Sequence, residues 1–104
     1  MKDFSNFTKL YASKSSKLKI FIFGAGTIGR LSDLALKKEG FDANCFIDSD
    51  IRKQGNKVQN KKIISPDDLK KFDSENTHIF IACNYFSSIV PFLKKNNFQN
   101  YYIV

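Results

Sequence analysis

The chain has 104 residues, of which 42% are hydrophobic and 14% are aromatic. This length suits one domain with one hydrophobic core, and it excludes an enzyme with separate cofactor and substrate domains. Eleven phenylalanines and four tyrosines exclude a disordered chain. No apolar run approaches the ~18 residues of a membrane-spanning helix, and the first residues lack the apolar segment of a secretory signal. We therefore expect a cytoplasmic protein without a membrane span.

The formal net charge is +7, from 17 basic and 10 acidic residues. A basic chain raises the question of nucleic-acid binding. Only two of the basic residues are arginines, Arg30 and Arg52, whereas arginine is preferred for phosphate and guanine recognition. The longest basic runs are lysine pairs, mostly near the ends of expected helices, where the helix dipole favours cations. We expect a solvated surface and no nucleic-acid partner.

Apolar patterning predicts an N-terminal segment followed by alternating strands and helices. Residues 1–17 contain a weak helix candidate over 2–13, with Phe4, Phe7 and Tyr11 on one stripe, and a polar joint. The expected strands are 18–23, 43–47, 63–64, 77–83 and 101–104. This alternation predicts a three-layer α/β sandwich over residues 18–104. Its mostly parallel, five-stranded sheet has the order 3-2-1-4-5 and helices on both faces.

The first helix of this domain is expected over residues 27–39, with Gly40 as its C-terminal stop. Four apolar residues recur at helical spacing and predict its buried face: Ile28, Leu31, Leu34 and Ala35.

Two further helices are expected. One starts at Ser65 and Pro66, with Asp68 in a capping-box position, and ends near Phe72. The other covers residues 86–95, where Pro91 indicates either a kink or a later start near Val90.

A glycine-rich turn separates the first strand from the first helix. Residues 24–29 read Gly-Ala-Gly-Thr-Ile-Gly, a Gly-x-Gly-x-x-Gly pattern between a buried strand and an amphipathic helix. In this pattern the first glycine permits a tight turn, the second lets a phosphate approach, and the third permits close helix packing. Free amides at the helix start then point at the anion. The expected phosphate-binding residues are Gly24, Ala25, Gly26, Thr27, Ile28 and Gly29, with Arg30 close enough to help.

An acidic residue, Asp48, follows the second strand. In a dinucleotide site, an acid at this place accepts hydrogen bonds from ribose hydroxyls. Because it would repel a ribose 2′-phosphate, it favours NAD or a nucleotide-sugar over NADP. Two alternatives stay open. Asp48 could cap its own loop beside an empty turn, or the turn could bind another anion such as coenzyme A.

The end of the fourth strand provides further candidates. Cys83 is expected to face the Gly24 turn and to line a ligand cleft, beside Asn84. Asn84, Tyr85 and Ser87 either contact a base or ribose, or form a loop in which Ser87 caps the next helix.

No catalytic or metal-binding residue is expected. His78, the only histidine, falls near the start of the fourth strand, away from the edge where ligands bind in such sheets. We expect it to be a surface or partly buried residue. Cys45 lies inside a strand and is expected in the core.

The segments KIFIFGAGTIGR, CFIDSD and IISPDDL together resemble a small Rossmann-like domain. It is similar to the N-terminal domain of bacterial sugar O- and N-acetyltransferases. It is also similar to the domain beside sugar-modifying methyltransferases and glycosyltransferases of surface-polysaccharide pathways. The resemblance covers about residues 18–104 and implies nucleotide-sugar binding, with Asp48 and Ser49 at the nucleoside. No hexapeptide repeat follows, so the second group of relatives fits better.

These observations predict a non-catalytic nucleotide-binding module that works with a catalytic domain or partner chain. One alternative is an NAD-dependent oxidoreductase or epimerase subunit whose active site another chain completes. No tyrosine precedes a lysine by four residues, the pair typical of short-chain dehydrogenases. A second alternative is a structural or oligomerisation domain with an empty turn. The sequence does not identify the base or the sugar of the ligand. It also leaves the oligomeric state open, and a homo-oligomer is one of the possibilities.

Overall fold

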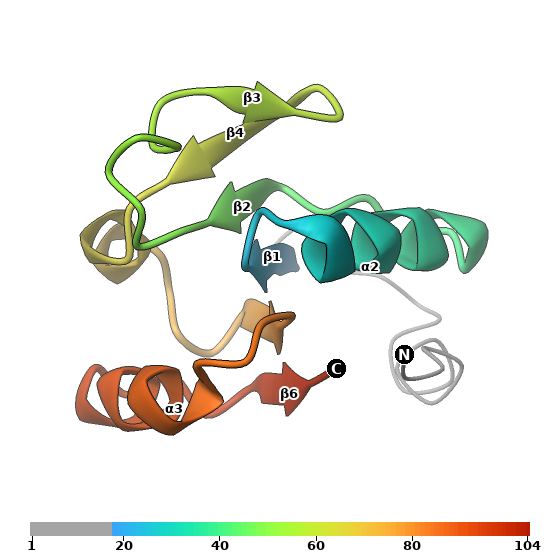
Figure 1. The fold of residues 1–104 in the computed structure, drawn as a ribbon. Coiled ribbons are helices and arrows are strands. Elements are labelled where there is room, and N and C mark those ends of the chain that lie inside the picture. Colours follow the sequence, from blue (N-terminus) through green and yellow to red (C-terminus); the bar gives the residue numbers. More distant parts are fainter. Residues whose placement is uncertain (1–17) are drawn as a thin grey trace.

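The computed structural model describes residues 18–104, which form a sheet between helices (Figure 1). The helix expected over residues 2–13 lies outside this part of the chain. The strands are β1 (Lys19–Phe23), β2 (Cys45–Ile47), β3 (Lys57–Val58), β4 (Lys61–Ile64), β5 (Thr77–Ile81) and β6 (Tyr101–Ile103). The helical elements are α2 (Thr27–Lys38), the short 3-10 helix η1 (Asp67–Lys71) and α3 (Phe86–Lys95).

The sheet has the order β3-β4-β2-β1-β5-β6. The strands from β4 to β6 are parallel to their neighbours, and β3 is antiparallel to β4. The prediction of five strands was therefore wrong, because the sheet has six. The predicted strand order omits the edge strand β3. The counterparts of the five expected strands are β4, β2, β1, β5 and β6. The missed strand β3 has only two residues, too few to show an apolar alternation in the sequence. It is joined to β4 by a turn at Gln59 and Asn60, both at positive φ.

Apolar side chains cover both faces of the sheet. On one face, Ile20 and Ile22 of β1 pack with Phe46 and with Leu36 of α2. On the other face, buried side chains of the same strands pack against η1 and α3, among them Phe21, Phe23, Leu69, Ile89 and Leu93. Figure 1 shows α2 on one side of the strands and η1 with α3 on the other. The predicted three-layer α/β architecture is thus present.

The buried face of α2 differs from the predicted one. Three of the expected core residues are exposed, Ile28 at 42%, Leu31 at 48% and Leu34 at 48%. The residues that are buried instead are Gly29, Ser32, Asp33 and Leu36. Both sets recur at helical spacing, so periodicity alone does not distinguish them.

Partners distant in the sequence explain why Asp33 is buried. Lys61 Nζ of β4 lies 3.1 Å from Asp33 Oδ1 and 3.0 Å from Asp42 Oδ1. The Gln59 side-chain amide donates to Asp33 Oδ2 at 2.7 Å. Because a buried carboxylate is tolerated when it is paired, these contacts join the β3–β4 hairpin to α2.

The other two helical elements follow the sequence more closely. Ser65 and Asp68 form the expected capping box, since Asp68 N donates to Ser65 Oγ and Ser65 N donates to Asp68 Oδ2, each at 3.2 Å. The helix that follows is a single 3-10 segment. Helix α3 starts at Phe86 and contains Pro91 within it, so the later start near Val90 was wrong.

Candidate functional site

The three glycines of the turn after β1 have three different surroundings. Gly24 has φ +119°, and a Cβ built there would lie 2.7 Å from the Ala82 carbonyl oxygen. A Cβ on Gly29 would lie 1.8 Å from the Gly24 carbonyl oxygen, so a side chain there would collide with the turn. A Cβ on Gly26 would meet nothing within 4 Å. Two glycines are therefore required by packing, whereas Gly26 borders open space.

The N-terminus of α2 has the features of an anion site. Gly26 is its N-cap residue, no side chain caps it, and its first turn contains no acidic residue. The first amides of a helix have no partner within the helix, and the helix dipole makes this end electropositive. Arg30 folds back along the same turn. Its Nε donates to the Gly26 carbonyl oxygen and its Nη2 donates to Thr27 Oγ1, both at 3.3 Å.

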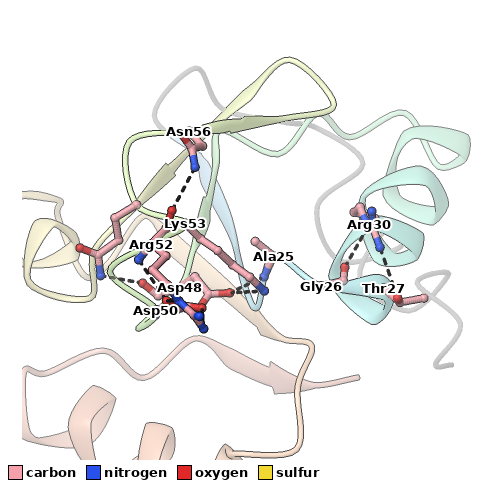
Figure 2. Close-up of polar contacts among 10 residues, drawn as sticks. Ala25, Gly26, Thr27, Arg30, Asp48, Asp50, Arg52, Lys53 and Asn56 are labelled. Atoms are coloured by element: carbon pink, nitrogen blue, oxygen red, sulfur yellow. Dashed lines mark hydrogen bonds and ion pairs between the residues drawn. The ribbon is translucent and has the colours of Figure 1, made fainter.

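Asp48 lies beside the turn, directly after β2 (Figure 2). Its Oδ2 accepts a hydrogen bond from the Ala25 amide at 3.0 Å, and its Oδ1 accepts one from the Asp50 amide at 2.9 Å. The Ala25 amide is thus occupied by the protein itself. The side chain of Asp48 is 17% exposed, so the carboxylate supports the turn and still borders the solvent. Parallel pairing of β1 and β2 brings these two groups together.

The loop after Asp48 adds charged groups that the sequence analysis missed. Lys53 Nζ lies 3.8 Å from Asp48 Oδ2. Arg52 pairs with Asp50 through two contacts of 3.1 Å between its guanidinium and the carboxylate. This hydrogen-bonded pairing lowers the pKa of Asp50 below its usual value. A basic residue shortly after an expected ribose-binding acid was the signal that could have pointed to Lys53.

One cavity of about 700 Å³ joins these groups at the carboxyl ends of β1, β2 and β5. The expected site residues that line it are Gly24, Gly26, Thr27, Ile28, Asp48, Ser49, Cys83 and Asn84. Ala25 and Gly29 are buried and are not among its lining residues. Further lining residues are Asp50, Lys53, Tyr85, Ser88 and Ile89. Ser87 lies inside the first turn of α3 and caps nothing, since the N-cap residue is Tyr85.

The remaining candidates lie elsewhere or offer little chemistry. His78 is only 3% exposed, so it is buried, and the expectation of a surface or partly buried residue was wrong. Its ring stacks on Tyr102, and its Nδ1 lies 2.8 Å from the Tyr102 hydroxyl. Cys45 and Cys83 are free thiols, and burial raises the pKa of Cys45. Within residues 18–104, no group of three or more His, Cys, Asp or Glu side chains could hold a metal ion.

At least two kinds of protein with solved structures share this fold. A Rex-family repressor, RSP, superposes with a TM-score of 0.69 at 17% identity, over 96% of this chain and 50% of that one. Its complex with β-NADH gives a TM-score of 0.68 at 17% identity, over 96% of this chain and 51% of that one. UDP-D-quinovosamine 4-dehydrogenase from Vibrio fischeri gives 0.65 at 22% identity, over 85% of this chain and 76% of that one.

These similarities show a Rossmann-like fold, and the chain spans about half the length of the Rex-family repressor. The acetyltransferase resemblance gains no support from these structures. RSP has also been solved with operator DNA, so the comparisons do not support the expected absence of a nucleic-acid partner. No curated protein sequence matches the chain. Residues 16–104 match the family described as C2185-like, N-terminal, and the chain belongs to this family.

Proposed function

We propose that the cavity between the glycine turn and Asp48 binds the nucleotide of NAD or of a nucleotide-sugar. The observation that carries this proposal is the open space at Gly26, where a Cβ would meet nothing within 4 Å. A glycine that packing does not require, at the uncapped start of a helix, leaves room for a phosphate to reach the first amides of α2. The solved complex of RSP with NADH supports a dinucleotide on this fold.

Asp48 and the β5–α3 segment would contact the rest of the nucleotide. Each oxygen of Asp48 accepts one protein hydrogen bond and keeps a lone pair for a ribose hydroxyl. Asn84 and Tyr85 line the same cavity from the end of β5, and the exposed Tyr85 ring offers a surface for stacking on a base. Ser49 and Cys83 complete the lining beside them.

We place this module in a cytoplasmic protein that modifies sugars, where it holds a ligand and another domain or chain carries out the chemistry. The contacts that the two lining carboxylates make within the protein fit a role in holding a ligand. Asp48 is bound to the turn and to Lys53, Asp50 is bound to Arg52, and the buried His78 does not line the cavity.

A second candidate is a subunit of an NAD-dependent oxidoreductase or epimerase. It is favoured by the similarity to UDP-D-quinovosamine 4-dehydrogenase, of which this chain covers 76%. The two candidates differ in the ligand that they require. An oxidoreductase or epimerase subunit needs NAD as its redox cofactor, so binding of a UDP-sugar without any binding of NAD would favour the non-catalytic module. Sustained NADH absorbance from the purified chain with NAD and UDP-sugars would contradict the non-catalytic module.

Thermal unfolding and calorimetry with NAD, NADP, UDP-sugars and coenzyme A test the binding proposal. A ligand at 100 times its Kd should stabilise the protein by about 2.7 kcal/mol. We expect this shift with NAD or a UDP-sugar. Gly26→Val should abolish it by blocking phosphate approach, without lowering the melting temperature of the free protein.

Two further variants locate the ribose. Asp48→Asn should weaken binding about tenfold, because a charged acceptor is lost. Asp67→Asn, at an exposed carboxylate of η1 that does not line the cavity, is the matched control and should bind normally. A shift with coenzyme A alone, or no shift with any ligand, would contradict the proposal.

A further inference from the structure

Lys53 lies where the proposed function places the ligand's ribose. Its Nζ is 3.8 Å from Asp48 Oδ2, and the two side chains are 44% and 17% exposed (Figure 2). Among the lining residues of the cavity within 18–104, Lys53 is the only cation. Arg52, one residue earlier, is engaged by Asp50 and is 90% exposed. The positive charge on this side of the cavity therefore comes from Lys53.

The loop that carries Lys53 is held by backbone hydrogen bonds within it and by one side-chain hydrogen bond to Asp48. Lys53 N donates to the Asp50 carbonyl oxygen at 3.0 Å, and Asn56 N donates to the Lys53 carbonyl oxygen at 3.1 Å. The Gln54 side-chain amide donates to the Asp48 carbonyl oxygen at 2.9 Å. These bonds position the backbone of Lys53 near Asp48, and the ammonium lies beside the carboxylate in the lining of the cavity.

This pair has the hydrogen-bonding capacity that a vicinal diol requires. An ionised carboxylate only accepts hydrogen bonds, an ammonium only donates them, and a hydroxyl does both. Two adjacent hydroxyls can thus donate to Asp48 and accept from Lys53 at the same time. A ribose 2′-phosphate would instead meet two carboxylates, Asp48 and Asp50, and a single ammonium in the lining.

We infer that Asp48 and Lys53 together recognise the free 2′,3′-diol of the ligand's ribose, so that the site selects ribonucleotides over 2′-deoxynucleotides. Lys53 is a specificity-determining residue in this account. The inference rests on the proposed function, because it assumes that a nucleotide occupies the cavity.

Calorimetric titration with ADP, UDP, 2′-deoxy-ADP and 2′-deoxy-UDP tests the inference. The wild-type protein should bind the better ribonucleotide about a hundredfold more tightly than its deoxy counterpart, the combined effect of hydrogen bonds to two charged groups. Lys53→Met should reduce this preference to about tenfold, since Asp48 alone remains. The exposed Lys57 of β3 does not line the cavity, and Lys57→Met should keep the full preference.

The ratio of the ribonucleotide affinity to the deoxynucleotide affinity distinguishes a contact with the 2′-hydroxyl from a general effect of the lysine charge. If Lys53→Met weakens the ribo and deoxy ligands by the same factor, or changes neither, the inference is overturned. It is also overturned if NADP binds the wild type more tightly than NAD and loses that advantage in Lys53→Met. If no nucleotide binds the wild-type protein at millimolar concentration, the proposed function fails and the inference fails with it.

Discussion

Gly26 and Gly29 are three residues apart and should respond oppositely to the same substitution. An added Cβ at Gly29 meets the backbone oxygen of Gly24 at 1.8 Å, whereas at Gly26 it meets nothing within 4 Å. Gly29→Ala should lower the free energy of unfolding by about 3 kcal/mol, because an overpacked backbone contact cannot relax cheaply. Gly26→Ala should leave it unchanged or slightly raised. Urea unfolding followed by circular dichroism measures both, and equal stabilities would contradict the packing described for the turn.

His78 should make the stability depend on pH in the weakly acidic range. Burial lowers the pKa of His78 below its usual value of 6.5. As the pH falls through 6.5, the unfolded chain takes up a proton that the folded protein does not bind, so the free energy of unfolding decreases. This loss continues until the pH reaches the lowered pKa of the folded state.

Urea unfolding at pH 7, 6 and 5 tests this prediction, with His78→Phe as the comparison. The wild-type protein should lose stability over this range, and the variant should lose less, because it lacks the titrating group. The pKa values of carboxylates such as Asp42 and Asp68 are lowered from 3.8, so these groups change the stability only at lower pH. Identical pH profiles for the two proteins would show that His78 is not the cause.

The packing roles of Gly24 and Gly29 could be predicted from the sequence, because each role follows from a fixed position in a strand–turn–helix segment. The position of Asp48 beside the turn was predicted for a related reason, since the carboxyl ends of β1 and β2 lie at one edge of a parallel sheet. Lys53 could not be placed in this way. Its position depends on hydrogen bonds within the loop after β2, and no spacing rule describes that loop.

Helix α2 shows that an apolar stripe need not be the buried face of a helix. Leu31 is 48% exposed and Leu36 is fully buried. Leu36→Ala should cost about 2–5 kcal/mol of unfolding free energy, through lost burial and a residual cavity. Leu31→Ala should change it by about 0.5 kcal/mol or less. Chemical unfolding of the two variants provides the comparison, and a larger loss for Leu31→Ala would restore the face predicted from periodicity.

The error in α2 has a physical cause that a local pattern does not contain. Asp33 is buried because Lys61 and Gln59 reach it from the β3–β4 hairpin. That hairpin includes a strand of two residues, which the sequence also failed to predict. By contrast, Ser65 and Asp68 contact each other within one turn, and the sequence predicted their capping box correctly. Short-range hydrogen bonds were predictable, whereas the contacts between α2 and the β3–β4 hairpin were not.

The sheet as a whole explains why the candidate site lies at one edge. Strands β1, β2 and β5 are parallel neighbours, so the turn, Asp48 and Cys83 follow strand ends at the same edge. The alternation of strands and helices in the sequence was sufficient to predict this arrangement. Within residues 18–104, no helix combines the length and the apolar character needed to cross a membrane.

The central claim is that a nucleotide phosphate occupies the space beside Gly26, with its ribose at Asp48. An NMR titration of the ¹⁵N-labelled protein with NAD, and separately with a UDP-sugar, tests it most directly. The amide signals of residues 26–29 and 48–53 should shift with one of these ligands and reach saturation. Saturable shifts confined to the outer face of α2 or to β6, or no shifts at millimolar ligand, would contradict it.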